Sequence, residues 1–255
     1  MNTGVVVVIP ARYASTRLPG KPLISLAHKP LIQWVYQRAA QIPNVKRIIV
    51  ATDHRRIVAA VSSFGGEAIL TPSDLNSGSE RVAWVAQSLA EEIIINLQGD
   101  EPLISTEAVG RAIQFLKDHP EIPAATLGSP LEDRNAWLDP SVVKVLVDAD
   151  GRALYFTRNP VPHFREDDFR PLPGLMQHIG IYLFRRRFLL EYATWPPAPL
   201  EQVEKLEQLR ILHRGYTLQV IESGYGSPGV DTPGDVKKVE KLLRQEGKVC
   251  DPEDS

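Results

Sequence analysis

The sequence predicts an α/β protein with a central, mostly parallel sheet and a smaller, partly antiparallel region in its second half. Strand-like apolar runs alternate with amphipathic helical stretches in βαβαβ order from Val5 to Leu70, joined by short connections. From about Asp139 the strand-like runs are instead separated by turns. With 255 residues, the chain can bury one large core. We therefore expect a single domain, 1–255, with an inserted, partly antiparallel region at about 139–184.

The first half of the chain supplies the alternating units. Pro30 suits the first position of a helix, Asp53 has the chemistry of an N-cap, and Gly65-Gly66 can close the helix that follows it. Ser77 and Glu80 have the spacing of a capping box. The expected strands are Val5–Ile9, Arg47–Thr52, Ala68–Leu70, Ile93–Leu97 and Ala124–Ser129, and the expected helices are Pro30–Ala39, Asp53–Phe64, Ser77–Leu89 and Thr106–Lys117.

The second half has shorter strands and fewer long helices between them. The proline-rich and charged segment Asn159–Gly174 is expected to be irregular. Before the last helix, Thr232 is expected to be the N-cap, with Pro233 in the first turn and Asp235 reaching back. The expected strands are Val142–Val147, Ala153–Thr157, His178–Phe184 and Leu218–Glu222, and the expected helices are Arg185–Ala193, Leu200–Arg214 and one that follows Asp231.

Composition excludes several classes of protein. A net charge of -2, with 43% hydrophobic and 24% charged residues, is ordinary for a globular protein and argues against a protein held on nucleic acid by bulk charge. The single cysteine, Cys250, rules out an internal disulfide bond. No export signal or membrane-spanning stretch is recognised, so a cytoplasmic protein without a membrane partner is expected.

A basic loop follows the first strand. Arg12, Arg17 and Lys21 supply cations, and Ser15 and Thr16 supply hydroxyl donors. Loops at the carboxyl end of a strand in an open α/β sheet are where such folds bind ligands, so this loop is expected to bind phosphate. It lacks the glycines of a P-loop and of a dinucleotide-binding turn.

Carboxylates occur at two other loops. Asp100 follows the strand Ile93–Leu97, and it is the first candidate for a Mg²⁺ ligand, because Mg²⁺ takes carboxylate and phosphate oxygens. Glu101 is interpreted as a turn carboxylate before Pro102. Asp231 has no role in the capping box of the last helix, so it is the candidate for a second carboxylate beside Asp100.

Seven segments together resemble the CMP-Kdo synthetases, the 3-deoxy-manno-octulosonate (Kdo) cytidylyltransferases. The resemblance extends to about Leu243. The segments are Pro10–Pro22, Ala51–Asp53, Asn76–Arg81, Gln98–Pro102, His178–Tyr182, Leu206–Arg210 and Gly229–Pro233.

The resemblance implies a Rossmann-like nucleotidyltransferase fold, a homodimer, and the transfer of CMP from CTP to the anomeric hydroxyl of Kdo for lipopolysaccharide-type glycan synthesis. It implies that Mg²⁺ binds Asp100 and Asp231 and that Lys21, Arg12 and both aspartates are catalytic. The implied nucleotide-binding residues are Arg12, Ser15, Lys21, Ser77, Gly78, Arg81 and Gln98. The implied sugar-binding residues are Gln98, Arg158, His178, Tyr182, Glu207 and Gln208. The partly antiparallel region is implied to serve dimerisation and sugar binding.

Some of these residues, and the acceptor sugar, allow a second interpretation. From the residues alone, His178 favours a structural role, and Glu207 and Gln208 favour a solvated helix surface whose core stripe is Val203, Leu206, Leu209 and Leu212. The family pattern has a histidine where this chain has Leu75 or Asn76, which leaves open an acceptor such as 8-amino-Kdo. A cytidylyltransferase for sialic acid, an enzyme that activates a sugar phosphate, and a non-catalytic nucleotide-binding module are also compatible with the sequence.

Overall fold

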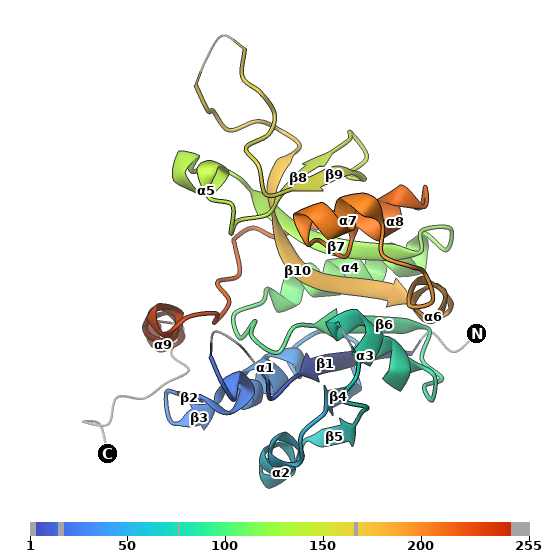
Figure 1. The fold of residues 1–255 in the computed structure, drawn as a ribbon, viewed down its shortest axis with the longest axis vertical. Helices are drawn as coiled ribbons and strands as arrows, with labels where there is room; N and C mark the ends of the chain where they lie inside the picture. Colours follow the sequence, from blue (N-terminus) through green and yellow to red (C-terminus); the bar gives the residue numbers. More distant parts are fainter. Residues whose placement is uncertain (1–3, 15–17, 76, 166–167, 246–255) are drawn as a thin grey trace. The chain divides into compact units, whose positions relative to one another are not determined.

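The computed structural model describes residues 4–14, 18–75, 77–165 and 168–245. The chain divides into two compact units, one made of Met1–Thr106 with Ser227–Ser255 and the other of Glu107–Gly226 (Figure 1). The expected single domain stays a prediction. None of the helices in the described ranges combines the length and apolar character needed to cross a membrane.

The first unit contains a parallel sheet in the strand order β6-β1-β4-β5 (Figure 1). The whole of β1 and of β6 is buried. Strands buried on both faces require near-continuous apolar runs, which is why the sequence pattern located them correctly. The strands are β1 (Val5–Ala11), β4 (Arg47–Thr52), β5 (Glu67–Leu70) and β6 (Ile93–Leu97).

Helices of the first unit cover this sheet. Helices α1 and α3 both contact β1 and β4, and α2 contacts β4 and β5. Pro30 is the N-cap of α1 rather than its first residue, because Lys29–Pro30 pairs with Ser25–Leu26 in a small hairpin. The further elements of the unit are η1 (Lys21–Leu23), β2 (Ser25–Leu26), β3 (Lys29–Pro30), α1 (Leu31–Ala39), α2 (Arg55–Ser63), α3 (Gly78–Ala86) and α9 (Pro233–Gln245).

The strand order reverses at β1. The strands that follow β1 in the chain, β4 and β5, lie on one side of it, and β6 lies on the other. The loops that leave the carboxyl ends of β1 and β6 therefore meet at a topological switch point, where open α/β sheets bind ligands. A Cβ atom at Gly99 would lie only 3.0 Å from the carbonyl oxygen of Pro10, so the close approach of the loop after β6 to the end of β1 depends on a glycine.

The second unit is a mixed sheet. Strand β10 pairs antiparallel with β7 and β8, β8 pairs antiparallel with β9, and β11 pairs parallel with β7. The expected partly antiparallel region is therefore confirmed. A bulge interrupts the pairing of β10 between Ile179 and Tyr182. The strands are β7 (Ala124–Pro130), β8 (Lys144–Val147), β9 (Ala153–Thr157), β10 (Leu175–Arg185) and β11 (Leu218–Glu222).

The expected helix Leu200–Arg214 is wrong, because the chain forms two short helices there. Lys205 adopts a left-handed conformation, with φ of 55°, and ends the first of them. A buried ion pair between Glu201 and Arg210 joins the two helices across this break. Val203, expected in the core, is 80% exposed. The helical periodicity of the apolar residues in this segment therefore did not predict its structure, because the buried pair of Glu201 and Arg210 favours two short helices.

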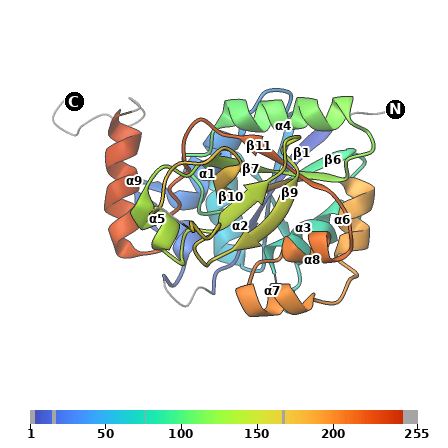
Figure 2. The ribbon, with the colours of Figure 1, turned by 90° about the horizontal axis from the view of Figure 1, so that it is seen from above.

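The other helices of the second unit lie on both sides of its strands, with α4 on one side and α7 and α8 on the other (Figure 2). The short helix α5 was not expected, and Asp133 caps its start. The helices are α4 (Thr106–Asp118), α5 (Arg134–Leu138), α6 (Arg186–Tyr192), α7 (Pro199–Glu204) and α8 (Leu209–His213).

Candidate functional site

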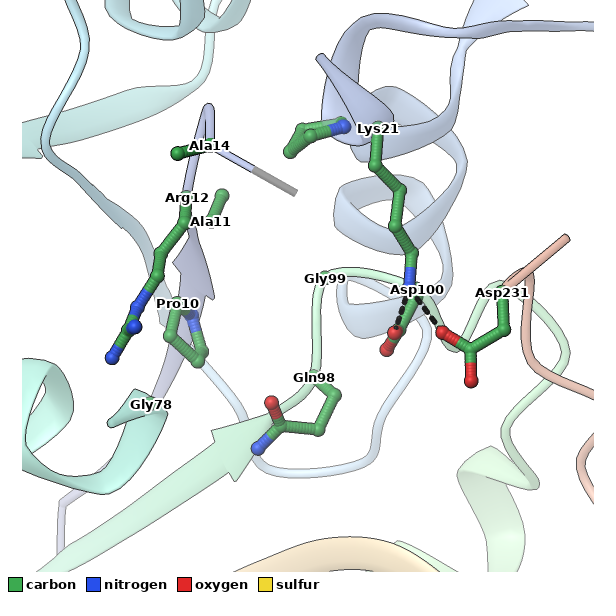
Figure 3. Close-up of a pocket in the computed structure, with 11 residues that line it drawn as sticks. Pro10, Ala11, Arg12, Ala14, Lys21, Gly78, Gln98, Gly99, Asp100 and Asp231 are labelled. Carbon is green, nitrogen blue, oxygen red and sulfur yellow. Dashed lines mark hydrogen bonds and ion pairs between the residues drawn. The ribbon is translucent and has the colours of Figure 1, made fainter. Parts of the chain in front are cut away.

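A pocket of about 330 Å³ opens in the first unit, where the loops after β1 and β6 meet. Its volume is in the range of small-molecule sites. Figure 3 shows Arg12 on one side of the pocket and Lys21 on the other side with two aspartates. The lining residues with chemically active side chains are Arg12, Lys21, Gln98, Asp100 and Asp231.

Lys21 joins the two candidate metal ligands. Its Nζ lies 2.5 Å from Oδ2 of Asp100 and 2.7 Å from Oδ1 of Asp231 (Figure 3). Burial alone would lower the pKa of Lys21, but the two carboxylates outweigh burial and raise the pKa above its ordinary value. The sequence hypothesis that Asp100 and Asp231 converge is confirmed in the first unit, whereas their role as metal ligands stays a prediction.

The segment before α9 is fastened to the loop after β6. The backbone N–H of Val230 donates to the carbonyl oxygen of Asp100 at 2.9 Å. The hydroxyl of Ser227 lies 2.5 Å from Oε2 of Glu101. Burial, with the nearby Asp100 charge, raises the pKa of Glu101 to about 8. The sequence indicated a turn carboxylate at Glu101. In the structure its side chain also accepts a hydrogen bond from Ser227 and so holds the segment that contains Asp231.

The start of α9 holds the backbone of Asp231. The backbone N–H groups of Asp231 and Thr232 both donate to Oδ2 of Asp235, at 3.1 and 2.7 Å. The N–H of Asp235 donates back to the hydroxyl of Thr232 at 3.3 Å. The expected capping box is confirmed, and it leaves the carboxylate of Asp231 directed at Lys21.

Arg12 and Gln98 complete the lining of the pocket. Among the described residues, the buried Nη2 atom of Arg12 has no hydrogen-bond partner. Such an atom is suited to a ligand oxygen, because an unpaired buried donor is costly. Gln98 donates to Oδ1 of Asn96 at 3.0 Å and lies beside Gly78, where a Cβ atom would come within 3.3 Å of Oε1.

The loop residues that precede α3 are only partly described. Ser77 is the N-cap of α3, where its hydroxyl accepts the backbone N–H of Glu80 at 3.1 Å. The predicted phosphate ligand Ser15, its neighbours Thr16 and Arg17, the loop residue Asn76 and the single cysteine Cys250 lie outside the described residues.

Arg81 is fully buried, and its contacts are with the protein. Its guanidinium donates to the hydroxyl of Thr71, to the carbonyl of Pro72 and to Oδ2 of Asp53. Burial lowers the pKa of Arg81, and the charge of Asp53 opposes that effect. A direct contact of Arg81 with nucleotide stays a prediction.

Asp53 is not the N-cap of α2, contrary to the sequence expectation. His54 caps this helix, because its Nδ1 accepts the backbone N–H of Arg56 at 3.2 Å. The carboxylate of Asp53 is instead engaged with Arg81 and with the backbone of Tyr13. The sequence pattern did not predict the contact of Asp53 with Arg81, since an acidic residue before a helix is ordinarily an N-cap.

Three of the predicted sugar-binding residues lie together in the second unit. The rings of His178 and Tyr182 have centroids 5.6 Å apart, which confirms that both face one side of β10. The hydroxyl of Tyr182 donates to Oε1 of Gln208 at 3.0 Å. Gln208 is buried, and its Nε2 has no hydrogen-bond partner within the described residues.

Burial also sets the ionisation of this cluster. It lowers the pKa of His178 to about 3, so the imidazole is neutral at neutral pH. His178 Nε2 lies 2.9 Å from the hydroxyl of Thr126. Burial, assisted by Glu207, raises the pKa of Tyr182 well above its ordinary value. The cluster therefore offers neutral hydrogen-bonding groups.

Arg158 is held by Glu204, a residue that the sequence analysis missed. Oε2 of Glu204 accepts the backbone N–H of Arg158 at 2.9 Å, and the Glu204 carbonyl accepts Nε at 2.9 Å. Glu204 also accepts the hydroxyl of Thr157 at 2.6 Å. The fully buried Lys144 donates to the carbonyl oxygen of Arg158 at 2.6 Å. These contacts fix the backbone and the stem of the Arg158 side chain.

The residues at Lys21 fit a magnesium ion. No group of three or more histidine, cysteine, aspartate or glutamate residues suited to a metal occurs in the ranges that the structure describes. Mg²⁺ commonly needs only one or two protein carboxylates, because water and substrate phosphates supply its other oxygens. Asp100 and Asp231 form such a pair, and their side chains are 31% and 48% exposed, so both are accessible to a ligand.

The chain is similar to cytidylyltransferases along most of its length. The profile of a family described as cytidylyltransferase matches residues 6–221. A 3-deoxy-manno-octulosonate cytidylyltransferase of Syntrophotalea carbinolica is 48% identical over 94% of this chain and 98% of its own length. The protein of the same name from Geobacter sulfurreducens is 45% identical over 94% of this chain and 99% of its own length.

Solved structures agree with the sequence comparison. A CMP:2-keto-3-deoxy-manno-octonic acid synthetase in complex with CTP superimposes with a TM-score of 0.89 at 43% identity, and the match covers 95% of this chain and 99% of that one. A cytidylyltransferase from Leptospira borgpetersenii gives a TM-score of 0.64 at 15% identity, which is a likeness of fold alone.

Proposed function

Because the chain belongs to the cytidylyltransferase family, we propose that it is a 3-deoxy-manno-octulosonate cytidylyltransferase, which converts CTP and Kdo to CMP-Kdo and pyrophosphate. The observation that carries the proposal is the similarity, over nearly the full length of both chains, to relatives with that name. The first unit supports it independently, because a basic loop and two carboxylates surround one pocket at a topological switch point.

The reaction is a displacement at phosphorus. The anomeric hydroxyl of Kdo releases its proton to the solvent, and its oxygen forms a bond to the α-phosphorus of CTP. The bond from that phosphorus to the oxygen bridging to the β-phosphate breaks, and pyrophosphate leaves with the electron pair of that bond. Positioning and charge neutralisation supply most of the acceleration in such reactions. Arg12, Ser15 and Lys21 are proposed to bind the triphosphate, whose departing end gains negative charge. Ser77, Gly78, Arg81 and Gln98 are the other nucleotide-binding residues of the proposal.

Asp100 and Asp231 are proposed to hold Mg²⁺. When bound, Mg²⁺ neutralises phosphate charge and lowers the pKa of a hydroxyl that it contacts. Nζ of Lys21 lies between the two carboxylates, at 2.5 and 2.7 Å from them. Its ammonium group can therefore exchange carboxylate partners for phosphate oxygens as the substrates bind.

The residues proposed to bind the acid sugar are Gln98, Arg158, His178, Tyr182, Glu207 and Gln208. Arg158 is a cation for the sugar carboxylate. The unpaired Nε2 of Gln208 and the neutral imidazole of His178 are hydrogen-bonding groups for hydroxyls. A homodimer and a cytoplasmic location are also part of the proposal.

The test is pyrophosphate release from CTP and Mg²⁺ with a panel of acid sugars. We expect turnover with Kdo, with CMP-Kdo as the second product. Turnover with 8-amino-Kdo or sialic acid, but not with Kdo, would replace the proposed acceptor by that sugar. CTP binding without turnover on any of them would favour a non-catalytic nucleotide-binding module. Size-exclusion chromatography with light scattering tests the homodimer.

A further inference from the structure

Asp53 lies just after β4, and its carboxylate bridges two distant segments of the first unit. Oδ1 accepts the backbone N–H of Tyr13 at 3.2 Å. Oδ2 accepts a hydrogen bond from Nη2 of Arg81 at 3.2 Å. The side chain of Asp53 is 13% exposed, and that of Arg81 is fully buried. The buried guanidinium of Arg81 thus holds the carboxylate of Asp53 against the backbone at the start of the basic loop.

Tyr13 is the base of that loop. Its carbonyl oxygen accepts the backbone N–H of Gly20 at 3.1 Å, which brings the two ends of the loop together. Arg12 immediately precedes Tyr13, and Lys21 immediately follows Gly20. The backbone of Tyr13 therefore sets the position of both cations that line the pocket.

The side chain of Tyr13 is held on the same surface. Its ring stacks on the ring of His54, with centroids 3.9 Å apart. Its hydroxyl accepts a hydrogen bond from Nη1 of Arg56 at 3.0 Å. A Cβ atom at Gly20, whose φ is 66°, would lie 3.6 Å from the Tyr13 ring. The start of α2 and Asp53 thus anchor one residue of the loop through its backbone and its ring.

Arg81 in turn is anchored independently of the loop. It donates to the hydroxyl of Thr71 and, at 3.2 Å, to the carbonyl oxygen of Pro72. The positive charge of Arg12 contributes to lowering the pKa of Arg81. Asp53 is the carboxylate that balances Arg81 at this point, so the loss of its charge would disturb both the loop backbone and the environment of Arg12.

We propose that Asp53, held by Arg81, is a positioning residue for the triphosphate: it fixes the backbone of Tyr13 and thereby the places of Arg12 and Lys21. This assignment rests on the proposed function, because it takes the basic loop to bind the phosphates of CTP. It gives Arg81 a role that acts through Asp53 and the loop.

The experiment compares Asp53→Ala and Asp53→Asn with the wild-type protein. Binding of inorganic pyrophosphate with Mg²⁺ is measured by calorimetry, and KM values for CTP and Kdo are measured by pyrophosphate release. For Asp53→Ala we expect a rise of about tenfold in the Kd for pyrophosphate and in the KM for CTP, since small misplacements of binding groups have effects of this size or larger. The KM for Kdo should stay within about twofold.

Asp53→Asn separates the two contacts of the carboxylate. Asparagine keeps an oxygen for the N–H of Tyr13 but loses the charge opposite Arg81. We expect a smaller rise in the pyrophosphate Kd than in Asp53→Ala. If Asp53→Ala does not fold, the pyrophosphate Kd of Asp53→Asn still tests the role of Asp53.

A matched control is Glu67→Gln. Glu67 forms an exposed ion pair with Arg47 at the start of β4, 2.8 Å long, so the variant removes an arginine–carboxylate pair from the same sheet. We expect all three constants of this variant to equal those of the wild type.

Two results would overturn the assignment of Asp53. In one, the pyrophosphate Kd is unchanged in both Asp53 variants. In the other, the KM values for Kdo and CTP rise by the same factor, which would indicate general distortion. If the wild type binds pyrophosphate but makes no CMP-Kdo, the proposed function fails, and the pyrophosphate Kd still decides the role of Asp53. A wild type that binds neither CTP nor pyrophosphate would contradict both.

Discussion

At the scale of single residues, the ammonium group of Lys21 is the centre of the candidate site. It lies between two carboxylates that are far apart in the sequence, and these carboxylates keep its pKa above the ordinary value in spite of burial. Without a cation between them, Asp100 and Asp231 would repel one another. The charge of Lys21 therefore offsets the charges of the two carboxylates that we propose as metal ligands.

The first prediction concerns the two aspartates. Asp100→Asn and Asp231→Asn should each lower kcat by at least about 10²-fold, the scale seen when a group that stabilises developing charge is removed. Circular dichroism and thermal unfolding should show a folded protein in both cases. A variant with nearly normal magnesium-dependent turnover would remove that residue from the proposed metal site.

The second prediction concerns Lys21 itself. Lys21→Met should tighten the binding of Mn²⁺ in the absence of nucleotide, because the cation that occupies the carboxylate pair is gone. The same change should weaken CTP binding, because a phosphate-binding charge is lost. Electron paramagnetic resonance of free Mn²⁺ measures the first effect, and calorimetry measures the second. Weaker Mn²⁺ binding in the variant would contradict competition between Lys21 and the metal.

At the scale of elements, the start of α9 determines where Asp231 lies. The capping box of Thr232 and Asp235 fixes the first turn, and Oδ2 of Asp235 also accepts the backbone N–H of Asp231. The side chain of Asp235 therefore takes part in the helix cap and also holds the backbone of Asp231.

The third prediction follows from this cap. Thr232→Ala should lower the free energy of unfolding by about 1 kcal/mol, the usual value for the loss of an N-cap side chain. Urea unfolding measures this change. Ser141→Ala serves as the comparison for the size of this effect, because Ser141 is exposed and lies far from Thr232 in the sequence. An unchanged midpoint in Thr232→Ala would mean that the cap contributes nothing to stability.

Sequence patterns predicted most elements because the physical signals were local. The strands Arg47–Thr52, Ile93–Leu97 and Leu218–Glu222 were expected with the bounds that the structure shows, since apolar runs record burial directly. The expected cap at Asp53 and the expected helix Leu200–Arg214 were wrong for a different reason. Asp53 is engaged by Arg81, and the helix is broken at Lys205 beside a buried ion pair, and neither long-range contact leaves a periodic pattern.

The site was predictable only in part. The cation Lys21 and the carboxylate Asp100 could be singled out from their places after buried strands. The convergence of Asp231 with them had little support from spacing alone, and it became an expectation through the family resemblance. The contact of Glu204 with Arg158 and the hydrogen bond from Ser227 to Glu101 could not be predicted from the sequence. A single polar residue acquires such a contact only through the tertiary fold.

At the scale of the whole molecule, the predicted nucleotide-binding residues all belong to the first compact unit, whereas the predicted sugar-binding residues other than Gln98 belong to the second. The sheet strands of the first unit pair in parallel with one another, whereas those of the second unit form both parallel and antiparallel pairs. The lowered pKa of His178 in the second unit makes the stability of the protein sensitive to acid.

The fourth prediction is the sign of that sensitivity. The folded-state pKa of His178 is about 3, below its ordinary value of 6.5, so the unfolded chain binds one more proton between these values. Stability from this group is therefore present above pH 6.5 and is lost as the pH falls toward 3, by up to about 1.4 kcal/mol per pH unit. Urea unfolding between pH 7 and 5 should show a flatter profile for His178→Gln than for the wild type. Parallel profiles would contradict a buried, neutral His178.

We propose that Lys21, Asp100 and Asp231 form the reaction centre of a CTP-using transferase. The most direct measurement is a crystal structure of the protein with CTP and Mg²⁺. It should show the metal between the carboxylates of Asp100 and Asp231, with Nζ of Lys21 on a phosphate oxygen of CTP. A triphosphate bound away from this pocket, with Lys21 still between the two aspartates, would contradict the claim.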